Sequence, residues 1–166
     1  IDGVLDTLSG FGVKVPDSHI VEEPYSIEGG REGLRRLLDA APAPTAVICG
    51  SDVLAFGALI ECEDRKLAVP RQISVAGFDD LDFAAHVRPP LTTIRVPAAE
   101  MGRRAAEYLV ARLDGKPHAQ HYPLDTLLIV RQSTSRPRLL RAAAADVPAA
   151  RRTGRGAARK RSRLPV

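Results

Sequence analysis

Four residues that can bind a polar ligand each follow closely on a short apolar run of the sequence. They are Tyr25, Ser51, Asp52 and Asp79. Carboxylates accept hydrogen bonds from vicinal hydroxyl groups, and an aromatic ring stacks on the apolar face of a sugar. If the runs are parallel strands, their carboxyl ends form the ligand-binding edge of an open α/β sheet. The residue types therefore predict a site for a sugar or a nucleoside-like small molecule.

Each of these residues also has a structural alternative. Ser and Asp are preferred immediately before helices, so Ser51 and Asp52 can instead cap the helix that follows them. Asp79 and its neighbour Asp80 can be turn residues at a strand end. Tyr25 can be an aromatic that packs at the mouth of a loop. The residue types alone leave these alternatives open.

The same side chains are poor candidates for catalysis. Ser51 lies in Cys-Gly-Ser-Asp-Val rather than in a Gly-x-Ser-x-Gly elbow, and no phosphate-binding Gly-rich loop precedes a Lys. His118 and His121 have no neighbouring Cys or further His to complete a metal site. We therefore expect neither an enzyme nor a bound metal or cofactor.

Helical and extended patterns alternate along the first 136 residues, which is typical of βαβ units. The predicted helices begin at Ile1, after the N-cap Ser26, at Val53 and at Pro97, and they end near positions 8, 41, 65 and 113. The predicted strands span 19–23, 45–49, 73–77, 92–96 and 127–130. This pattern predicts an α/β fold with a doubly wound, mainly parallel sheet.

Several blocks of the sequence resemble the lactose/galactose repressor family of bacterial transcription regulators. They occur at the family's spacing and are found at 44–52, 55–58, 73–80, 89–97 and 128–134. The resemblance implies a type I periplasmic-binding-protein-like fold, represented mostly by its second lobe. The helix-turn-helix head and first sensor subdomain of such regulators are expected to precede Ile1.

The resemblance also implies roles for the candidate residues. Tyr25 matches the family's ring-stacking aromatic, Ser51 matches the polar residue before Asp52, and Asp79 matches the carboxylate that contacts the effector. The family often has Asn where this chain has Ser51, which replaces an amide with a shorter hydroxyl. The identity of the effector is left open by this difference.

The function implied by the resemblance is that of a homodimeric, cytoplasmic regulator that responds to a sugar-like effector. Residues 1–136 would be part of its effector-binding and dimerisation domain, with dimer contacts from the helix at 53–65 and from Leu81 to Pro89. Operator DNA would be bound only through the head. The alternatives are an exported periplasmic sugar-binding protein, which shares the two-lobed fold, and a nonfunctional regulator fragment.

In the family, the segment from about Pro97 to Pro123 crosses to the first lobe. The apolar stripe of the helix at 97–113 is therefore expected to lack its usual partner, which favours association through the exposed face.

Basic residues are concentrated at the C-terminal end of the chain. From Arg136 to Val166 there are ten Arg or Lys and one acid, although the whole chain carries only +4. The body before this segment is therefore acidic. Few large apolar residues occur in 137–166, which predicts a disordered basic tail. It can be a non-specific nucleic-acid contact or a solvated end.

Two further features concern the cell compartment. Cys49 and Cys62 are too few and too ordinary in spacing for a disulfide framework, and we expect both to be buried thiols. The sequence shows neither an apolar stretch of membrane-spanning length nor a signal-peptide pattern. Both features favour a cytosolic protein that does not contact the membrane.

Overall fold

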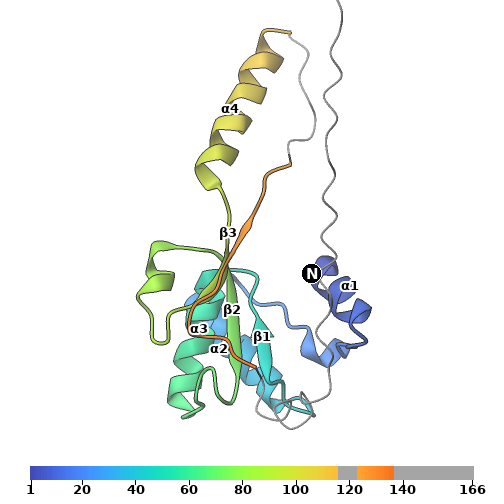
Figure 1. The fold of residues 1–166 in the computed structure, drawn as a ribbon, viewed down its shortest axis with the longest axis vertical. Coiled ribbons are helices and arrows are strands. Elements are labelled where there is room, and N and C mark those ends of the chain that lie inside the picture. Colours follow the sequence, from blue (N-terminus) through green and yellow to red (C-terminus); the bar gives the residue numbers. More distant parts are fainter. Residues whose placement is uncertain (116–122, 137–166) are drawn as a thin grey trace, which may run out of the picture.

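The fold is built on a four-stranded sheet (Figure 1). The computed structural model describes residues 1–115 and 123–136. The strands are β1 (Ala46–Ile48), β2 (Ser74–Asp79), β3 (Thr92–Arg95) and β4 (Leu127–Ile129), in that spatial order. The first three strands are parallel, whereas β4 runs antiparallel to β3. The prediction of an α/β fold with a mainly parallel sheet is confirmed.

The helices agree closely with the predicted ones. They are α1 (Asp2–Gly10), α2 (Ile27–Asp39), α3 (Asp52–Asp64) and α4 (Ala98–Leu113), with short 3-10 helices at Asp17–His19 and Asp82–Ala85. The hydroxyl of Ser26 caps α2 by accepting a hydrogen bond of 2.9 Å from the backbone N–H of Gly29. Helix α2 packs along α3, and α3 packs on β2.

The predicted strand at 19–23 is wrong. Asp17–His19 form a turn of 3-10 helix, and residues 20–25 belong to no strand. Ile20 is extended, with φ −111° and ψ 113°, but the described sheet contains no strand paired with this segment. A β-rich run predicts an extended backbone, whereas pairing depends on a neighbouring strand that the local sequence does not specify.

The hydrophobic core lies between the sheet and the α2–α3 pair. Its most buried apolar side chains are Leu34, Val47, Cys49, Ala55, Phe56, Ala58, Leu59, Cys62, Ile73, Val75, Ala84 and Leu91. Cys49 and Cys62 are free buried thiols, as predicted. Burial raises the pKa of Cys49 to about 12 and that of Cys62 to about 11. Both thiols therefore stay protonated and pack as small apolar groups.

Helix α4 extends away from this core (Figure 1). None of its residues is buried, and the exposed fractions of Met101, Leu109 and Leu113 are 48%, 59% and 87%. The predicted apolar stripe is therefore exposed. Two predictions from the sequence concern segments outside the described residues: the basic tail from position 137, and the loop that contains His118 and His121.

Two glycines bring α2 and α3 into backbone contact. A Cβ atom on Gly57 would lie 2.0 Å from the carbonyl oxygen of Ile27, and one on Gly30 would lie 2.1 Å from that of Leu54. Real side chains do not approach a backbone oxygen so closely, so any other residue would push the helices apart. Gly30 and Gly57 therefore set the spacing of the pair.

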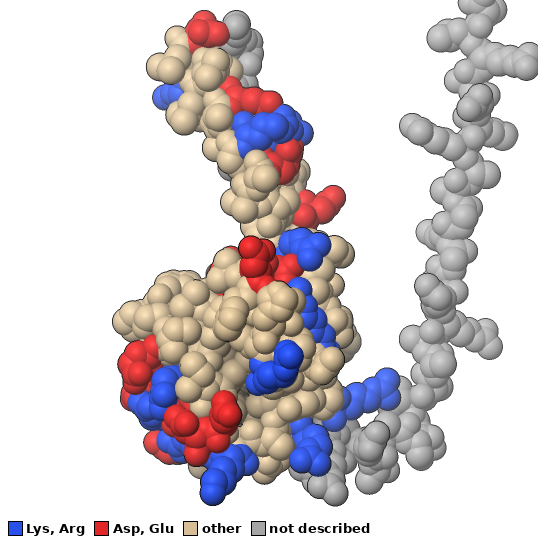
Figure 2. Space-filling model, turned by 90° about the vertical axis from the view of Figure 1, so that its left-hand side faces the viewer, with Lys and Arg blue, Asp and Glu red and all other residues tan. Residues whose placement is uncertain are grey.

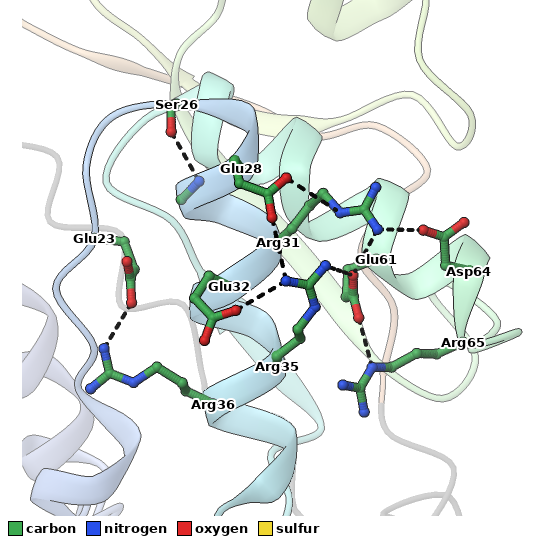
Figure 3. Close-up of polar contacts among 11 residues, drawn as sticks. Glu23, Ser26, Glu28, Arg31, Glu32, Arg35, Arg36, Glu61, Asp64 and Arg65 are labelled. Atoms are coloured by element: carbon green, nitrogen blue, oxygen red, sulfur yellow. Dashed lines mark hydrogen bonds and ion pairs between the residues drawn. The ribbon is translucent and has the colours of Figure 1, made fainter.

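Glu61 is the centre of an ion-pair network that joins α2 and α3 (Figure 3). Its carboxylate lies 2.8 Å from Nε of Arg65, 3.1 Å from Nη2 of Arg35 and 3.3 Å from Nη2 of Arg31. Arg31 also contacts Asp64 at 2.6 Å. The hydrogen bond from Arg65, together with Arg35 and Arg31, lowers the pKa of Glu61, although burial opposes the shift.

We expect Glu61→Gln to lower the free energy of unfolding by about 2 kcal/mol at pH 7, because three guanidinium groups lose their buried anionic partner. The folded-state pKa of Glu61 is depressed, so its stabilisation is present above the unfolded-state pKa of about 4.3 and is lost as the pH falls through the folded value. Urea unfolding should therefore give a lower free energy of unfolding for Glu61→Gln than for the unmodified chain at pH 7. The two values should become equal in acid.

Glu63→Gln is the matched control, because Glu63 lies two residues away on α3 and is exposed. An equal loss of stability in both variants would contradict the role given to Glu61.

Candidate functional site

The predicted site residues lie around the carboxyl ends of β1 and β2. Ser51 and Asp52 closely follow β1, while Asp79 is the last residue of β2. The Tyr25 hydroxyl belongs to the same region, because it would lie 3.5 Å from a Cβ atom on Gly50. The parallel pairing of β1 with β2 thus brings these side chains to one edge of the sheet.

Ser51 is the N-cap of α3. Its backbone is extended, with φ −155° and ψ 161°, and its Oγ accepts a hydrogen bond of 3.3 Å from the N–H of Leu54. The capping alternative is therefore correct for Ser51. Because the hydroxyl accepts in this contact, its own hydrogen stays free to donate, although Ser51 is only 5% exposed.

Asp52 does not cap α3 but links α3 to other parts of the fold. The capping alternative is wrong, because Ser51 is the cap and Asp52 is the first helical residue. The Asp52 side chain is fully buried, and its two oxygens accept hydrogen bonds from the Leu81 N–H at 2.8 Å and the Thr93 hydroxyl at 2.6 Å. Asp52 thereby ties α3 to β3 and to the loop after β2. A ligand contact for Asp52 stays a prediction.

Gly77 makes room for this buried carboxylate. A Cβ atom at position 77 would lie 2.2 Å from Oδ1 of Asp52 and 2.9 Å from Cδ2 of Leu91. Neither Gly77 nor Thr93 was singled out from the sequence. The partners of Asp52 are separated from it by 29 and 41 residues, so no local pattern could have identified them.

Asp79 ends β2 in an unusual backbone conformation. Its φ is 115° and that of Asp80 is 56°, values that residues other than Gly adopt rarely and mainly where surrounding contacts enforce them. Partial desolvation of its carboxyl group, together with the nearby charge of Asp52, raises the pKa of Asp79, although the residue is exposed. Within the described ranges, its carboxylate has no hydrogen-bonding or ion-pair partner. Asp79 is thus an acceptor without a protein donor at this edge.

Asp80, for which the sequence left a turn role and a ligand contact open, is held by two arginines. Its Oδ2 lies 2.6 Å from Nε of Arg95, and its Oδ1 lies 2.6 Å from Nη2 of Arg131. Burial alone would raise the pKa of Asp80, but the hydrogen bonds from Arg131 and Arg95 lower it below the usual value. The two arginines are 15 and 51 residues away in the chain, so sequence reasoning missed both.

Tyr25 is 73% exposed, so it does not pack as a core aromatic. Its ring stands beside Gly50 at the edge that carries Asp79, with a large apolar face open to solvent. An exposed ring and an unpartnered carboxylate at the same edge of a sheet can together hold a polyhydroxylated ligand, with stacking from the ring and hydrogen bonds to the carboxylate.

Two negative observations concern the described part of the chain. Within it, no three His, Cys, Asp or Glu side chains gather in a way that could hold a metal ion. None of its helices combines the length and hydropathy of a membrane span.

The chain is similar to bacterial repressors over most of its length. Residues 3–134 match the family described as Periplasmic binding protein-like domain. The HTH-type transcriptional repressor CytR of Escherichia coli strain K12 is 37% identical over 135 residues, which are 81% of this chain and 40% of the repressor. The chain thus spans less than half the length of this curated relative.

Two solved structures share the fold. The transcriptional regulator CelR, in complex with cellobiose, is 32% identical with a TM-score of 0.75, covering 79% of this chain and 40% of that one. A LacI family transcriptional regulator from Mycobacterium smegmatis is 30% identical with a TM-score of 0.76, covering 82% of this chain and 51% of that one. The chain therefore belongs to the periplasmic-binding-protein-like family and, within it, to the lactose/galactose repressor group that its sequence resembles.

Proposed function

We propose that this chain is the effector-sensing part of a bacterial transcription regulator, with the effector bound at the edge formed by Tyr25, Ser51 and Asp79. The observation that carries the proposal is the Asp79 carboxylate, which has no hydrogen-bonding or ion-pair partner among the described residues and ends the strand that pairs with β1, the strand leading to Ser51. The similarity to the complex of CelR with cellobiose supports a sugar as the effector.

In this proposal each residue has a distinct task. Asp79 accepts hydrogen bonds from vicinal hydroxyls, Tyr25 stacks on an apolar face of the ring, and Ser51 donates its hydroxyl hydrogen. Asp52 has both oxygens engaged, so it supports the site by holding the loop after β2.

The regulatory output would be a population shift. An effector that binds this edge and an opposing lobe stabilises the closed arrangement of the two, and it can shift the equilibrium only by its difference in affinity for the two arrangements. The whole regulator would act in the cytoplasm, where a head domain contacts operator DNA.

An exposed apolar patch supports the proposed homodimer. Leu81, Phe83 and Ile60 are 41%, 61% and 37% exposed. They lie in the segment and the helix for which dimer contacts are implied. The ring of Phe83 is also fixed in place, because it meets Phe56 edge to face at a centroid distance of 5.6 Å. Large apolar side chains exposed in the segments implied for dimer contacts are what a protein interface would cover.

Asp79→Asn should abolish effector binding while leaving the fold intact, because Asp79 is exposed and its carboxylate forms no hydrogen bond or ion pair with another described group. The test is a thermal-shift screen of the full chain against cellobiose, common monosaccharides and nucleosides. A ligand present at 100 times its dissociation constant stabilises the folded state by about 2.7 kcal/mol, which is readily measured.

The matched control is Asp39→Asn, the same charge change at an exposed position where α2 ends, far along the helix from Ser26. Stabilisation by a sugar that is kept in Asp39→Asn and lost in Asp79→Asn supports the site. A ligand that stabilises Asp79→Asn as strongly as the unmodified chain would place the binding site elsewhere.

A further inference from the structure

Asp80 is the most constrained carboxylate near the proposed site. Its side chain is 5% exposed, and each of its oxygens forms a 2.6 Å ion pair, one with Arg95 and the other with Arg131. Two short charge-assisted hydrogen bonds to separate oxygens use the strongest acceptor positions of the group. Asp80 is therefore not available to a ligand in the way that Asp79 is.

The two arginines mark the places where the chain leaves the core and returns to it. Arg95 is the last residue of β3, two positions before the N-cap of α4 at Pro97. Arg131 follows the end of β4 by two positions. In Figure 1, α4 extends away from the core beyond the end of β3, and β4 leads back into the core beside β3. Asp80 thus links the residue at which β3 ends to a residue that closely follows β4.

Arg131 is itself held firmly in this position. Its Nη1 donates to the carbonyl oxygen of Leu91 at 2.8 Å, and its backbone N–H donates to Oγ1 of Thr92 at 2.9 Å. The returning chain remains attached beyond this point, because the Ser133 hydroxyl donates to the carbonyl oxygen of Val75 at 2.6 Å. The Asp80 ion pairs therefore connect to a rigid part of the sheet.

Asp80 is also adjacent to the Asp79 carboxylate. Both residues have positive φ angles, a conformation that the surrounding structure must enforce. On one side the two arginines hold Asp80, and on the other the buried Asp52 accepts the N–H of Leu81. The loop is thus fixed at Asp80 and at Leu81, the two positions that directly follow Asp79 at the end of β2.

We propose that Asp80 is a positioning residue: together with Arg95 and Arg131 it forms a clamp that couples the orientation of α4 to the placement of the Asp79 carboxylate. Figure 2 shows acidic and basic side chains side by side where the α4 extension joins the body. A substitution of Asp80, Arg95 or Arg131 would then change both the orientation of α4 and the position of the Asp79 carboxylate. The part that concerns the effector rests on the proposed function, whereas the part that concerns α4 does not.

The first test measures the orientation of α4 without any ligand. Nitroxide labels are attached to Leu113→Cys, on the exposed end of α4, and to Glu63→Cys, on the exposed face of α3. The native thiols are buried and should not react. Pulsed electron resonance should give a broader or displaced distance distribution in Asp80→Asn than in the labelled parent.

Two further variants make this result specific. Glu100→Gln removes an equal charge and breaks ion pairs to Arg103 and Arg104 within α4, so it should leave the distance distribution unchanged. Arg95→Gln removes only one arm of the clamp, at a residue whose side chain is 55% exposed. It should broaden the distribution even if Asp80→Asn fails to fold.

The second readout follows Asp79 itself. Carbon-detected NMR can titrate its carboxyl group in Arg95→Gln and in the parent chain, and we expect a displaced titration midpoint in the variant, because the loss of the cation paired across from Asp79 and the movement of the loop relative to Asp52 both act on this group. Unchanged distances and an unchanged midpoint in a folded Arg95→Gln would overturn the clamp. Failure of every sugar to bind would count against the proposed function alone, because neither measurement uses a ligand.

Discussion

Gly57→Ala should unfold at a much lower urea concentration than the unmodified chain, with a loss of about 3 kcal/mol or more in the free energy of unfolding. The added Cβ would lie 2.0 Å from the carbonyl oxygen of Ile27 and 2.9 Å from the backbone N of Arg31. Both are backbone atoms of α2, so no side-chain rotation relieves the overlap. The two helices must separate, and the core beneath them opens.

Gly33→Ala is the control for Gly57→Ala. Gly33 lies in the same α2–α3 pair, but its added Cβ would come only to 3.4 Å from Cγ of Glu23, at the flexible side chain of an exposed ion pair. Because Ala is the better helix former, this variant should be neutral or stabilised by up to about 1 kcal/mol. Equal destabilisation by the two substitutions would show that helix spacing is not what Gly57 provides.

Asp52→Ala should cost about 3 kcal/mol of stability and should also abolish effector binding. The substitution removes a buried acceptor of two hydrogen bonds, from the Leu81 N–H and the Thr93 hydroxyl, and leaves the former without a partner. Since Leu81 follows the Asp79–Asp80 pair, the loop that presents Asp79 loses one of its two attachments. Urea unfolding and the sugar thermal-shift assay measure the two effects separately.

Thr93→Val removes only one of these hydrogen bonds and keeps the shape of the buried side chain. We expect a loss of about 1 kcal/mol and retained ligand binding, because Asp52 still accepts from Leu81. If Asp52→Ala were as stable as Thr93→Val, the buried carboxylate would not be the link between α3, β3 and the loop after β2.

The sequence predicted the helices and four of the five proposed strands because these elements have local signals. Ser26 and Ser51 stand immediately before α2 and α3, and both are the observed N-caps. The placement of Ser51 and Asp79 at one edge followed from alternating helices and strands, since parallel pairing places consecutive strand ends together.

The parts that could not be predicted depend on contacts between distant residues. The Asp80 ion pairs, and the burial of Asp52 against Thr93, join residues that are 15 to 51 positions apart. The wrong strand at 19–23 has the same origin, because an extended segment becomes a strand only when another strand lies beside it. A single sequence carries no direct record of such pairs.

The most direct test of the proposed effector site is an NMR titration of the nitrogen-labelled full chain with cellobiose, monosaccharides and nucleosides. We predict that at least one ligand shifts the amide signals of Tyr25, Gly50 and Ser51 and of the loop at 78–81, and that Asp79→Asn loses these shifts. Shifts confined to other surfaces, or the same shifts in Asp79→Asn, would contradict the assignment of this edge as the effector site.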